Sequence, residues 1–337
     1  MTKIFITGGA GFIGANLAAH YLSQGKSVTI YDNLSRPGVT NNLTWLHQTY
    51  LKKLLKIIEA DVRDFDRLKP SVQGHDLVFH FAGQTAVTTS ITNSRHDFEV
   101  NALGTFNLLE AIRLTNPKAT VVYSSTNKVY GDIARINTKR RGKRYYSIES
   151  ASIDESEPIN FYSPYGCSKG TGDQYMHDYY RIYGINTIIF RQSCIYGAHQ
   201  FGVEDQGWVA HFTAQAIKNK PITIYGDGKQ VRDMLYITDL VRAYDLATQH
   251  LSITAGQIYN IGGGIRNTIS LLELLDLLQA LLGRPITTTT KAQRLGDQRV
   301  YISNIDKAKR DFDWQPEVSV PDGVNFLFTW LNEFLTA

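Results

Sequence analysis

Short apolar runs alternate along the first part of the chain with longer stretches whose apolar residues recur every three or four positions. The runs lie at residues 3–7, 27–31, 56–60, 77–81, 120–123 and 186–190, and the amphipathic stretches lie at 15–24, 40–54, 97–114 and 170–183. Runs of this length predict strands, and the stretches between them predict helices. The alternation predicts an α/β fold with a parallel, doubly wound sheet that binds its ligand at the carboxyl ends of its strands.

The turn after the first run is rich in glycine. It reads Gly8-Gly-Ala-Gly11-Phe12-Ile13-Gly14 and leads into the first predicted helix. Glycines in this context let backbone N–H groups approach a pyrophosphate, and the helix N-terminus adds a partial positive charge. Gly8, Gly11, Phe12 and Ile13 are therefore candidate contacts for a dinucleotide.

The second run leads into Asp32, which Asn33 follows. A carboxylate at this strand end accepts hydrogen bonds from ribose hydroxyls and repels a 2′-phosphate, so it favours NAD over NADP. Arg36 lies close enough in sequence to favour NADP instead. Because Asp32 stands at the strand end itself, we expect NAD, with Asn33 as a neighbouring contact.

Later strand ends carry further cofactor candidates. Asp61 and Val62 follow the third strand and are placed to meet the adenine, whereas Ala82 and Gln84 follow the fourth, where small residues suit the close passage of a cofactor. Asn101 lies on the predicted helix 97–114, where it could contact the cofactor or brace a neighbouring strand.

Tyr165 and Lys169 lie four residues apart, at the start of a stretch that reads as a helix. Side chains at this spacing share one helix face. A phenol becomes a base at neutral pH only if its pKa falls by roughly three units, which needs about 4 kcal/mol and which nearby cations can supply. Tyr225 and Lys229 have the same spacing, but they flank a glycine turn and share no helix face.

The alternation becomes irregular from about residue 196, which predicts a smaller C-terminal lobe. We expect residues 1–195 to form the dinucleotide-binding domain, joined by a returning segment near 231–262, and residues 196–337 to form mainly the substrate lobe. Arg232 and Arg294 carry guanidinium groups suited to a diphosphate. An arginine taken alone more often makes a surface ion pair.

Composition narrows the class of protein. The 337 residues carry a net charge of +4, which suits an anionic small molecule, and contain two cysteines, Cys167 and Cys194, too few for a disulfide framework. No apolar run approaches the ~20 residues of a membrane helix, and the chain starts directly with a needed strand, so we expect a cytoplasmic location. The histidines show no metal-ligand spacing, and no metal is expected.

Residues 132–161 interrupt the alternation with a long polar segment. It carries the basic cluster Lys139, Arg140, Arg141, Lys143 and Arg144. The segment is either a solvated loop or a cover over the active-site mouth that attracts phosphates. No aromatic platform repeats beside the cluster, so nucleic acid is not expected.

Taken together, these motifs resemble those of the extended short-chain dehydrogenase/reductase family that acts on nucleotide sugars. The resemblance covers almost the whole chain. It is carried by the stretches 7–14, 61–62, 165–169 (Tyr-Gly-Cys-Ser-Lys), 231–235 (Val-Arg-Asp-Met-Leu), 260–263 and 294–297 (Arg-Leu-Gly-Asp). It implies a Rossmann sheet with a smaller substrate lobe, NAD as cofactor, and a homo-oligomer, either a dimer through the helices at 97 and 165 or a dimer of dimers.

The resemblance also implies roles for individual residues. Thr126, Tyr165 and Lys169 would be the catalytic hydroxyl, the base and its orienting partner, and Tyr165 and Lys169 would also contact the cofactor. The substrate-binding residues would be Gln84, Thr126, Asn127, Ser193, Gln206, Tyr225, Arg232 and Arg294.

Two departures narrow the reaction. The 4,6-dehydratases of the family carry Thr-Asp-Glu where this chain has Thr126-Asn127-Lys128, so the acid and base needed to eliminate water are missing. Many relatives have Asn where this chain has Cys194, which puts an amide contact to the ligand in doubt.

The stretches 82–84, 123–131, 205–208 and 297–299, with the insertion after Asp132, are most similar to the branch that epimerises CDP-linked sugars at C2 for lipopolysaccharide O-antigen. The resemblance therefore implies a CDP-sugar substrate. A UDP-sugar 4-epimerase, a nucleotide-sugar reductase and an NAD-sensing binding protein remain alternatives.

Overall fold

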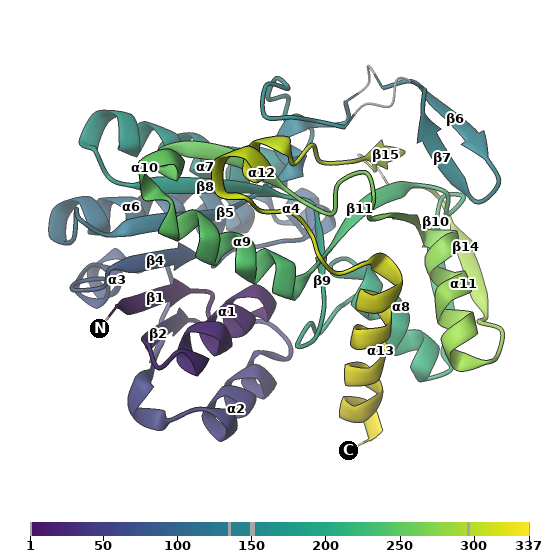
Figure 1. Cartoon of the computed structure of the whole chain (residues 1–337), viewed down its shortest axis with the longest axis horizontal. Coiled ribbons are helices and arrows are strands. Elements are labelled where there is room, and N and C mark those ends of the chain that lie inside the picture. The colour runs from purple at the N-terminus through teal and green to yellow at the C-terminus, as the bar shows by residue number, and fades with distance from the viewer. Residues whose placement is uncertain (1, 134–135, 149–151, 295–296, 337) are drawn as a thin grey trace.

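A computed structural model describes residues 2–133, 136–148, 152–294 and 297–336. Met1, part of the 132–161 insertion, and Leu295 and Gly296 of the 294–297 motif lie outside the described residues. The centre of the molecule is a seven-stranded sheet in the order β12-β8-β5-β4-β1-β2-β3 (Figure 1). Its strands are β1 (Lys3–Thr7), β2 (Ser27–Asp32), β3 (Leu55–Glu59), β4 (Leu77–His80), β5 (Thr120–Thr126), β8 (Thr187–Gln192) and β12 (Gln257–Ile261).

All neighbouring strands of this sheet are parallel. The strand order reverses between β1 and β4, which is where a doubly wound sheet opens a crevice for its ligand. The predicted fold class is therefore confirmed.

Alternate residues of each strand point to opposite faces of the sheet, and both faces are buried under apolar clusters. Ile4 and Ile6 of β1 belong to one apolar cluster, whereas Phe5 between them belongs to the other. The first cluster includes residues of α1 (Phe12–Ser23), α2 (Val39–Thr49) and α9 (Ile237–Gln249), and the second those of α3 (Phe65–Ser71), α6 (Gly104–Thr115) and α7 (Pro164–Tyr183). Helices thus cover both faces of the sheet, so a ligand can reach the sheet at the carboxyl ends of its strands.

The irregular C-terminal part builds smaller sheets beside the large one, at the right of Figure 1. β11 (Val231–Tyr236) pairs with β9 (Cys194–Tyr196), β13 (Thr268–Ser270) and β15 (Val300–Tyr301), while β10 (Ile222–Tyr225) pairs with β14 (Thr288–Lys291). The helices of this part include α8 (Trp208–Ile217), α11 (Leu271–Leu282) and α13 (Val320–Thr336). Between β11 and α11 the chain returns to the large sheet as β12, which pairs with β8.

Three element boundaries differ from the predicted ones in ways that affect the site. β5 continues to Thr126, so this residue ends the strand. α7 starts at Pro164, because the Ser163 hydroxyl caps it by accepting a hydrogen bond from Gly166 N at 3.0 Å. The predicted helix 97–114 is instead α5 (Ser94–Phe98), a π-helical turn η2 (Glu99–Leu103) and α6.

Within the insertion, β6 (Thr138–Arg141) and β7 (Arg144–Ser147) form a hairpin that lies against the C-terminal part. Lys143 Nζ lies 2.6 Å from a carboxylate oxygen of Asp276 in α11, and the Tyr145 hydroxyl donates to Asp227 at 2.8 Å. Among the described helices, none is long and apolar enough to cross a membrane.

Candidate active site

A cavity of about 740 Å³ opens at the carboxyl edge of the large sheet and continues between the two parts of the molecule. With one exception, every candidate residue predicted from the sequence lines it. These residues are Gly8, Gly11, Phe12, Ile13, Asp32, Asn33, Asp61, Val62, Ala82, Gln84, Thr126, Asn127, Tyr165, Lys169, Ser193, Gln206, Tyr225, Arg232 and Arg294. The fold therefore brings together residues more than 280 positions apart.

The exception is Asn101, which is only 1% exposed. Its side-chain oxygen accepts a hydrogen bond from Gln84 N at 2.9 Å, and its amide nitrogen donates to Gln84 O and to Ser168 Oγ. It sits in the π-helical turn η2 and ties the loop after β4 to α7. Of the two roles left open, these contacts are those of a brace.

The glycine turn packs closely against the loop after β4 and leads into the N-terminus of α1. Gly8 has a φ of +67°, and a Cβ atom there would lie 2.5 Å from Ala82 N, so only glycine fits. Gly11 precedes α1 and offers no side chain to cap it. The first N–H groups of a helix without a capping side chain form a site for an anion. This turn fits the pyrophosphate of a dinucleotide.

Asp32 is held at the end of β2 by backbone groups. Its carboxylate oxygens accept hydrogen bonds from Ala10 N at 3.0 Å and Leu34 N at 2.9 Å. Burial raises the pKa of Asp32, whereas the two backbone bonds and the charge of Arg36 lower it. Arg36 itself donates to Thr85 Oγ1 at 2.8 Å and to Gln206 Oε1 at 2.9 Å. The Arg36 guanidinium is thus hydrogen-bonded to side chains other than that of Asp32.

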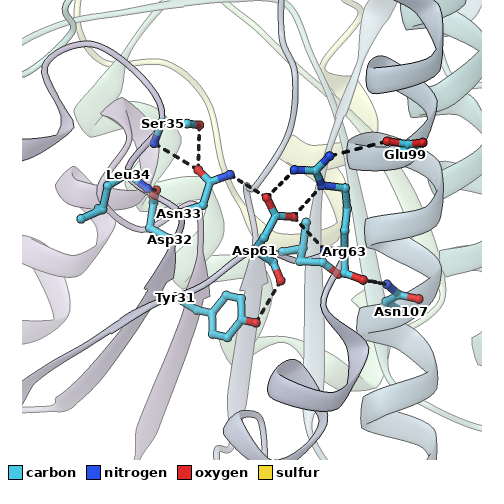
Figure 2. Close-up of polar contacts among 10 residues, drawn as sticks. Tyr31, Asp32, Asn33, Leu34, Ser35, Asp61, Arg63, Glu99 and Asn107 are labelled. Carbon is cyan, nitrogen blue, oxygen red and sulfur yellow. Dashed lines mark hydrogen bonds and ion pairs between the residues drawn. The ribbon is translucent and has the colours of Figure 1, made fainter.

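Figure 2 shows how Asp61 is fixed next to this site. Asn33 donates to its carboxylate at 2.8 Å, and Arg63 donates to it through Nε and Nη2, both at 2.9 Å. The hydrogen bonds from Arg63 hold the pKa of Asp61 well below its usual range. Arg63 also reaches Glu99 at 3.5 Å, so it connects the end of β3 to the π-helical turn. Sequence reasoning did not identify Arg63.

The predicted catalytic residues meet on the opposite wall of the cavity. Tyr165 is 9% exposed, and Thr126 and Lys169 are 6% exposed each. Thr126 comes from the end of β5, and its hydroxyl acts to lower the pKa of the Tyr165 phenol, while Tyr165 N donates to Ser90 Oγ at 3.1 Å. Lys169 Nζ lies 4.2 Å from the centre of the Tyr123 ring. The arrangement can hold a sugar hydroxyl between a phenol and a threonine.

Burial dominates the electrostatics of Tyr165 in the chain without cofactor. Burial raises the pKa of Tyr165 to about 12, while Thr126 and Arg36 lower it and Asp97 raises it. Burial also lowers the pKa of Lys169 to about 7, against the opposing effect of Asp173 and Asp97. In the chain without cofactor, desolvation therefore outweighs the nearby charges, and the expectation that Lys169 and the positive nicotinamide of bound NAD together favour the phenolate stays a prediction.

The residues predicted to bind the substrate are held by hydrogen bonds and ion pairs with other protein groups. Arg294 lies over the Tyr225 ring at 4.0 Å and 3.0 Å from Asp205 Oδ1. Arg232 is paired with Asp297, and the Ser193 hydroxyl is hydrogen-bonded to Asp233. The Tyr225 hydroxyl donates to Glu204 at 2.6 Å, and the Gln84 side chain is hydrogen-bonded to Ala86.

Two further residues of the cavity wall, Cys194 and Lys128, had no predicted role in the site. Cys194 accepts a hydrogen bond from Trp208 Nε1 at 2.9 Å, and burial raises the pKa of its thiol to about 11, so it stays protonated at neutral pH. Lys128 lies two residues beyond Thr126 and also lines the cavity. The signal for Lys128 was its place at a strand end, where ligand-contacting side chains are expected.

Two further observations concern the basic hairpin and metal binding. No described residue of the hairpin 138–147 lines the cavity, and the hairpin packs on the C-terminal part instead. Among the described residues, no three His, Cys, Asp or Glu side chains are grouped so that they could hold a metal ion.

The chain is similar in sequence and fold to known proteins of one family. The family model described as "NAD dependent epimerase/dehydratase family" matches residues 4–262. The chain is 45% identical to CDP-paratose 2-epimerase of Salmonella typhi, over 97% of this chain and 98% of that protein, and 32% identical to a putative UDP-glucose 4-epimerase of Methanocaldococcus jannaschii over the same shares. The fold also matches a crystal structure of UDP-glucuronic acid 4-epimerase from Bacillus cereus in complex with UDP-glucuronic acid and NAD, with a TM-score of 0.85. That match covers 99% of this chain and 100% of the other, at 28% sequence identity. The glycine turn and Asp32 fit the NAD that gives this family its name, and the chain belongs to the NAD dependent epimerase/dehydratase family.

Proposed function

We propose that this protein epimerises CDP-paratose at C2, giving CDP-tyvelose. The observation that carries the proposal is the 45% identity to a CDP-paratose 2-epimerase along almost the full length of both chains. The cavity agrees with it, because Thr126, Tyr165 and Lys169 are all present while the acid and base that dehydration needs are replaced by Asn127 and Lys128.

In this proposal, Tyr165 accepts the proton of the sugar's C2 hydroxyl, and Thr126 hydrogen-bonds the oxygen as it becomes a carbonyl. Both groups are almost fully buried and line the same cavity, and hydrogen bonds in such a site are strong. When bound, NAD supplies the hydride acceptor and donor and a positive charge near the phenol. Lys169 holds the nicotinamide ribose.

The transient keto-sugar must present its other face before it is reduced, so the sugar is held loosely. Affinity then comes from the nucleotide diphosphate. Arg232 and Arg294 bind it, exchanging their pairs with Asp297 and Asp205 for phosphate oxygens. Asn127, Ser193, Gln206, Tyr225 and Gln84 complete the substrate side.

A UDP-sugar 4-epimerase is the second candidate, favoured by the relative from Methanocaldococcus jannaschii. The same groups would act on another carbon. The test is to identify the dinucleotide released on denaturation and to assay the protein with CDP-paratose, UDP-glucose and UDP-glucuronic acid. Stoichiometric NAD with turnover of CDP-paratose alone supports the proposal, whereas turnover of a UDP-sugar alone contradicts it.

We also propose that the protein is a dimer in the cytoplasm and serves O-antigen synthesis. Large apolar side chains are exposed on α5, η2, α6 and α7, among them Phe98, Leu103, Phe106 and Tyr175. Exposed apolar surface of this kind marks a contact between subunits. Light scattering tests the dimer, and a Phe106→Glu variant is expected to be monomeric.

A further inference from the structure

Lys128 is a cation inside the cavity with little to balance it. It lies in the short helix η3 (Asn127–Tyr130), directly after β5, and its N–H donates to Thr126 Oγ1 at 3.2 Å. Its ammonium donates to the neutral amide oxygen of Gln298 at 3.4 Å. Among the described residues, no carboxylate forms an ion pair with it. A partly buried ammonium with one long hydrogen bond calls for an anion.

The groups around Lys128 do not neutralise its charge. Arg232 of β11 lowers the pKa of Lys128, and burial lowers it more, to about 8, while Asp297 and Cys194 raise it. Asp297 is the one carboxylate among these groups, and it is already paired with Arg232. Two cations from different parts of the molecule therefore share one acidic group at the cavity wall.

The position of Lys128 relative to Thr126 matters for the reaction. In a nucleotide sugar the diphosphate is attached to C1, and C2 is bonded directly to C1, whereas C4 lies across the ring. When C2 faces Thr126 and Tyr165, the phosphoryl group nearest the sugar is brought to the same end of the cavity. When C4 faces them, that phosphoryl group lies farther away.

We propose that Lys128 binds the sugar-linked phosphoryl group and so sets the sugar with C2, not C4, at Tyr165. The inference rests on the proposed function. Lys128 then supplies the countercharge closest to the reacting carbon, while Arg232 and Arg294 hold the rest of the diphosphate. The anion in turn relieves the repulsion between Lys128 and Arg232.

The test compares CDP with CMP, because only CDP has the second phosphoryl group. Calorimetry on the NAD-loaded protein is expected to show CDP binding weakened about tenfold or more in Lys128→Met, as for other charge-assisted contacts. CMP binding should change less than about twofold, and Lys128→Arg should keep most of the CDP affinity. Lys143→Met, which removes an exposed lysine outside the cavity, is the matched control and should bind CDP like the wild type.

A pH series separates this role from a structural one. The groups facing Lys128 are Arg232, Asp297 and Cys194. CDP affinity of the wild type is expected to fall as pH rises through about 8, where Lys128 loses its proton, whereas Lys128→Arg should keep its affinity there. Bound NAD content and thermal unfolding show whether Lys128→Met is folded, and the Lys128→Arg series decides the question if it is not.

Unchanged CDP binding in Lys128→Met, or an equal loss for CDP and CMP, overturns the inference. So does a parallel pH dependence in the wild type and Lys128→Arg. These outcomes are independent of the proposed function, which fails instead if the wild type turns over only UDP-sugars.

Discussion

The two sides of the cavity are built differently. On the sheet side, Tyr165, Thr126 and Lys169 come from a strand end and a long helix and are almost fully buried. On the lobe side, Arg294 comes from a loop, and its partner Asp205 is 46% exposed. Groups on rigid elements can hold the geometry that chemistry needs, whereas exposed pairs can exchange partners with an arriving anion. The contrast separates residues that determine the rate from residues that determine affinity.

The largest expected effect is on the sheet side. Tyr165→Phe keeps the ring but removes the group that accepts the proton, so turnover of CDP-paratose should fall roughly 10³-fold. Bound NAD should remain, as measured by the dinucleotide released on denaturation. Tyr175→Phe alters an exposed tyrosine of the same helix and is the control. A rate close to normal for Tyr165→Phe would remove this residue from the role of base.

Beneath the catalytic helix lies a buried ion pair that tests how rigid this side is. Asp173 of α7 accepts hydrogen bonds from Arg191 Nε and Nη2, both at 2.9 Å, and from Ser125 Oγ at 2.8 Å. Asp173→Asn leaves Arg191 buried without a countercharge and should lower the free energy of unfolding by about 3–5 kcal/mol in urea titrations.

The exposed pair Lys143–Asp276 on the hairpin provides the matched comparison for this ion pair. Lys143→Met should cost less than about 1 kcal/mol in the same titrations. Equal losses of unfolding free energy in Asp173→Asn and Lys143→Met would contradict the contrast between buried, rigid pairs and exposed pairs.

On the lobe side we expect a change in affinity instead of rate. Arg294→Gln removes a charge from the cavity wall and should raise KM for the nucleotide sugar roughly tenfold or more, since a hydrogen bond to a charged group contributes about 1.5–3 kcal/mol. The maximal rate should stay within about twofold. Arg310→Gln, on an exposed ion pair outside the cavity, is the control. A fall in kcat at constant KM would instead place Arg294 among the residues that act on the transition state.

The sequence predicted the strand ends well, because short apolar runs followed by polar residues indicate them directly. It therefore identified Asp32 at the end of β2, whereas Tyr165 followed from its helical spacing to Lys169 and Thr126 from the family resemblance. It did not identify Arg63, whose role depends on where Glu99 and Asp61 meet in space. Nor could it give the cost of burying the Tyr165 phenolate, because that cost depends on packing that no local pattern reports.

The last expected effect concerns a buried histidine beneath the cofactor side. His80 is fully buried between two hydroxyls, with Nδ1 2.6 Å from Thr7 Oγ1 and Nε2 2.9 Å from Thr105 Oγ1. Burial lowers the pKa of His80 to about 3, whereas an unfolded histidine titrates near 6.5.

The unfolded chain therefore binds a proton that the folded chain does not. Protonation of His80 in the unfolded chain therefore leaves the free energy of unfolding unchanged above pH 6.5. It lowers that free energy as pH falls toward 3, by up to about 1.4 kcal/mol for each pH unit. Carboxylates and other buried histidines titrate in the same range, so the informative quantity is the difference between wild type and His80→Asn. The variant should be less stable at pH 7 but should lose less stability between pH 6.5 and 5, while His47→Asn on the exposed surface should follow the wild type. Parallel curves for wild type and His80→Asn would show that His80 is protonated in the fold, and that this side of the cavity is less tightly closed than its packing indicates.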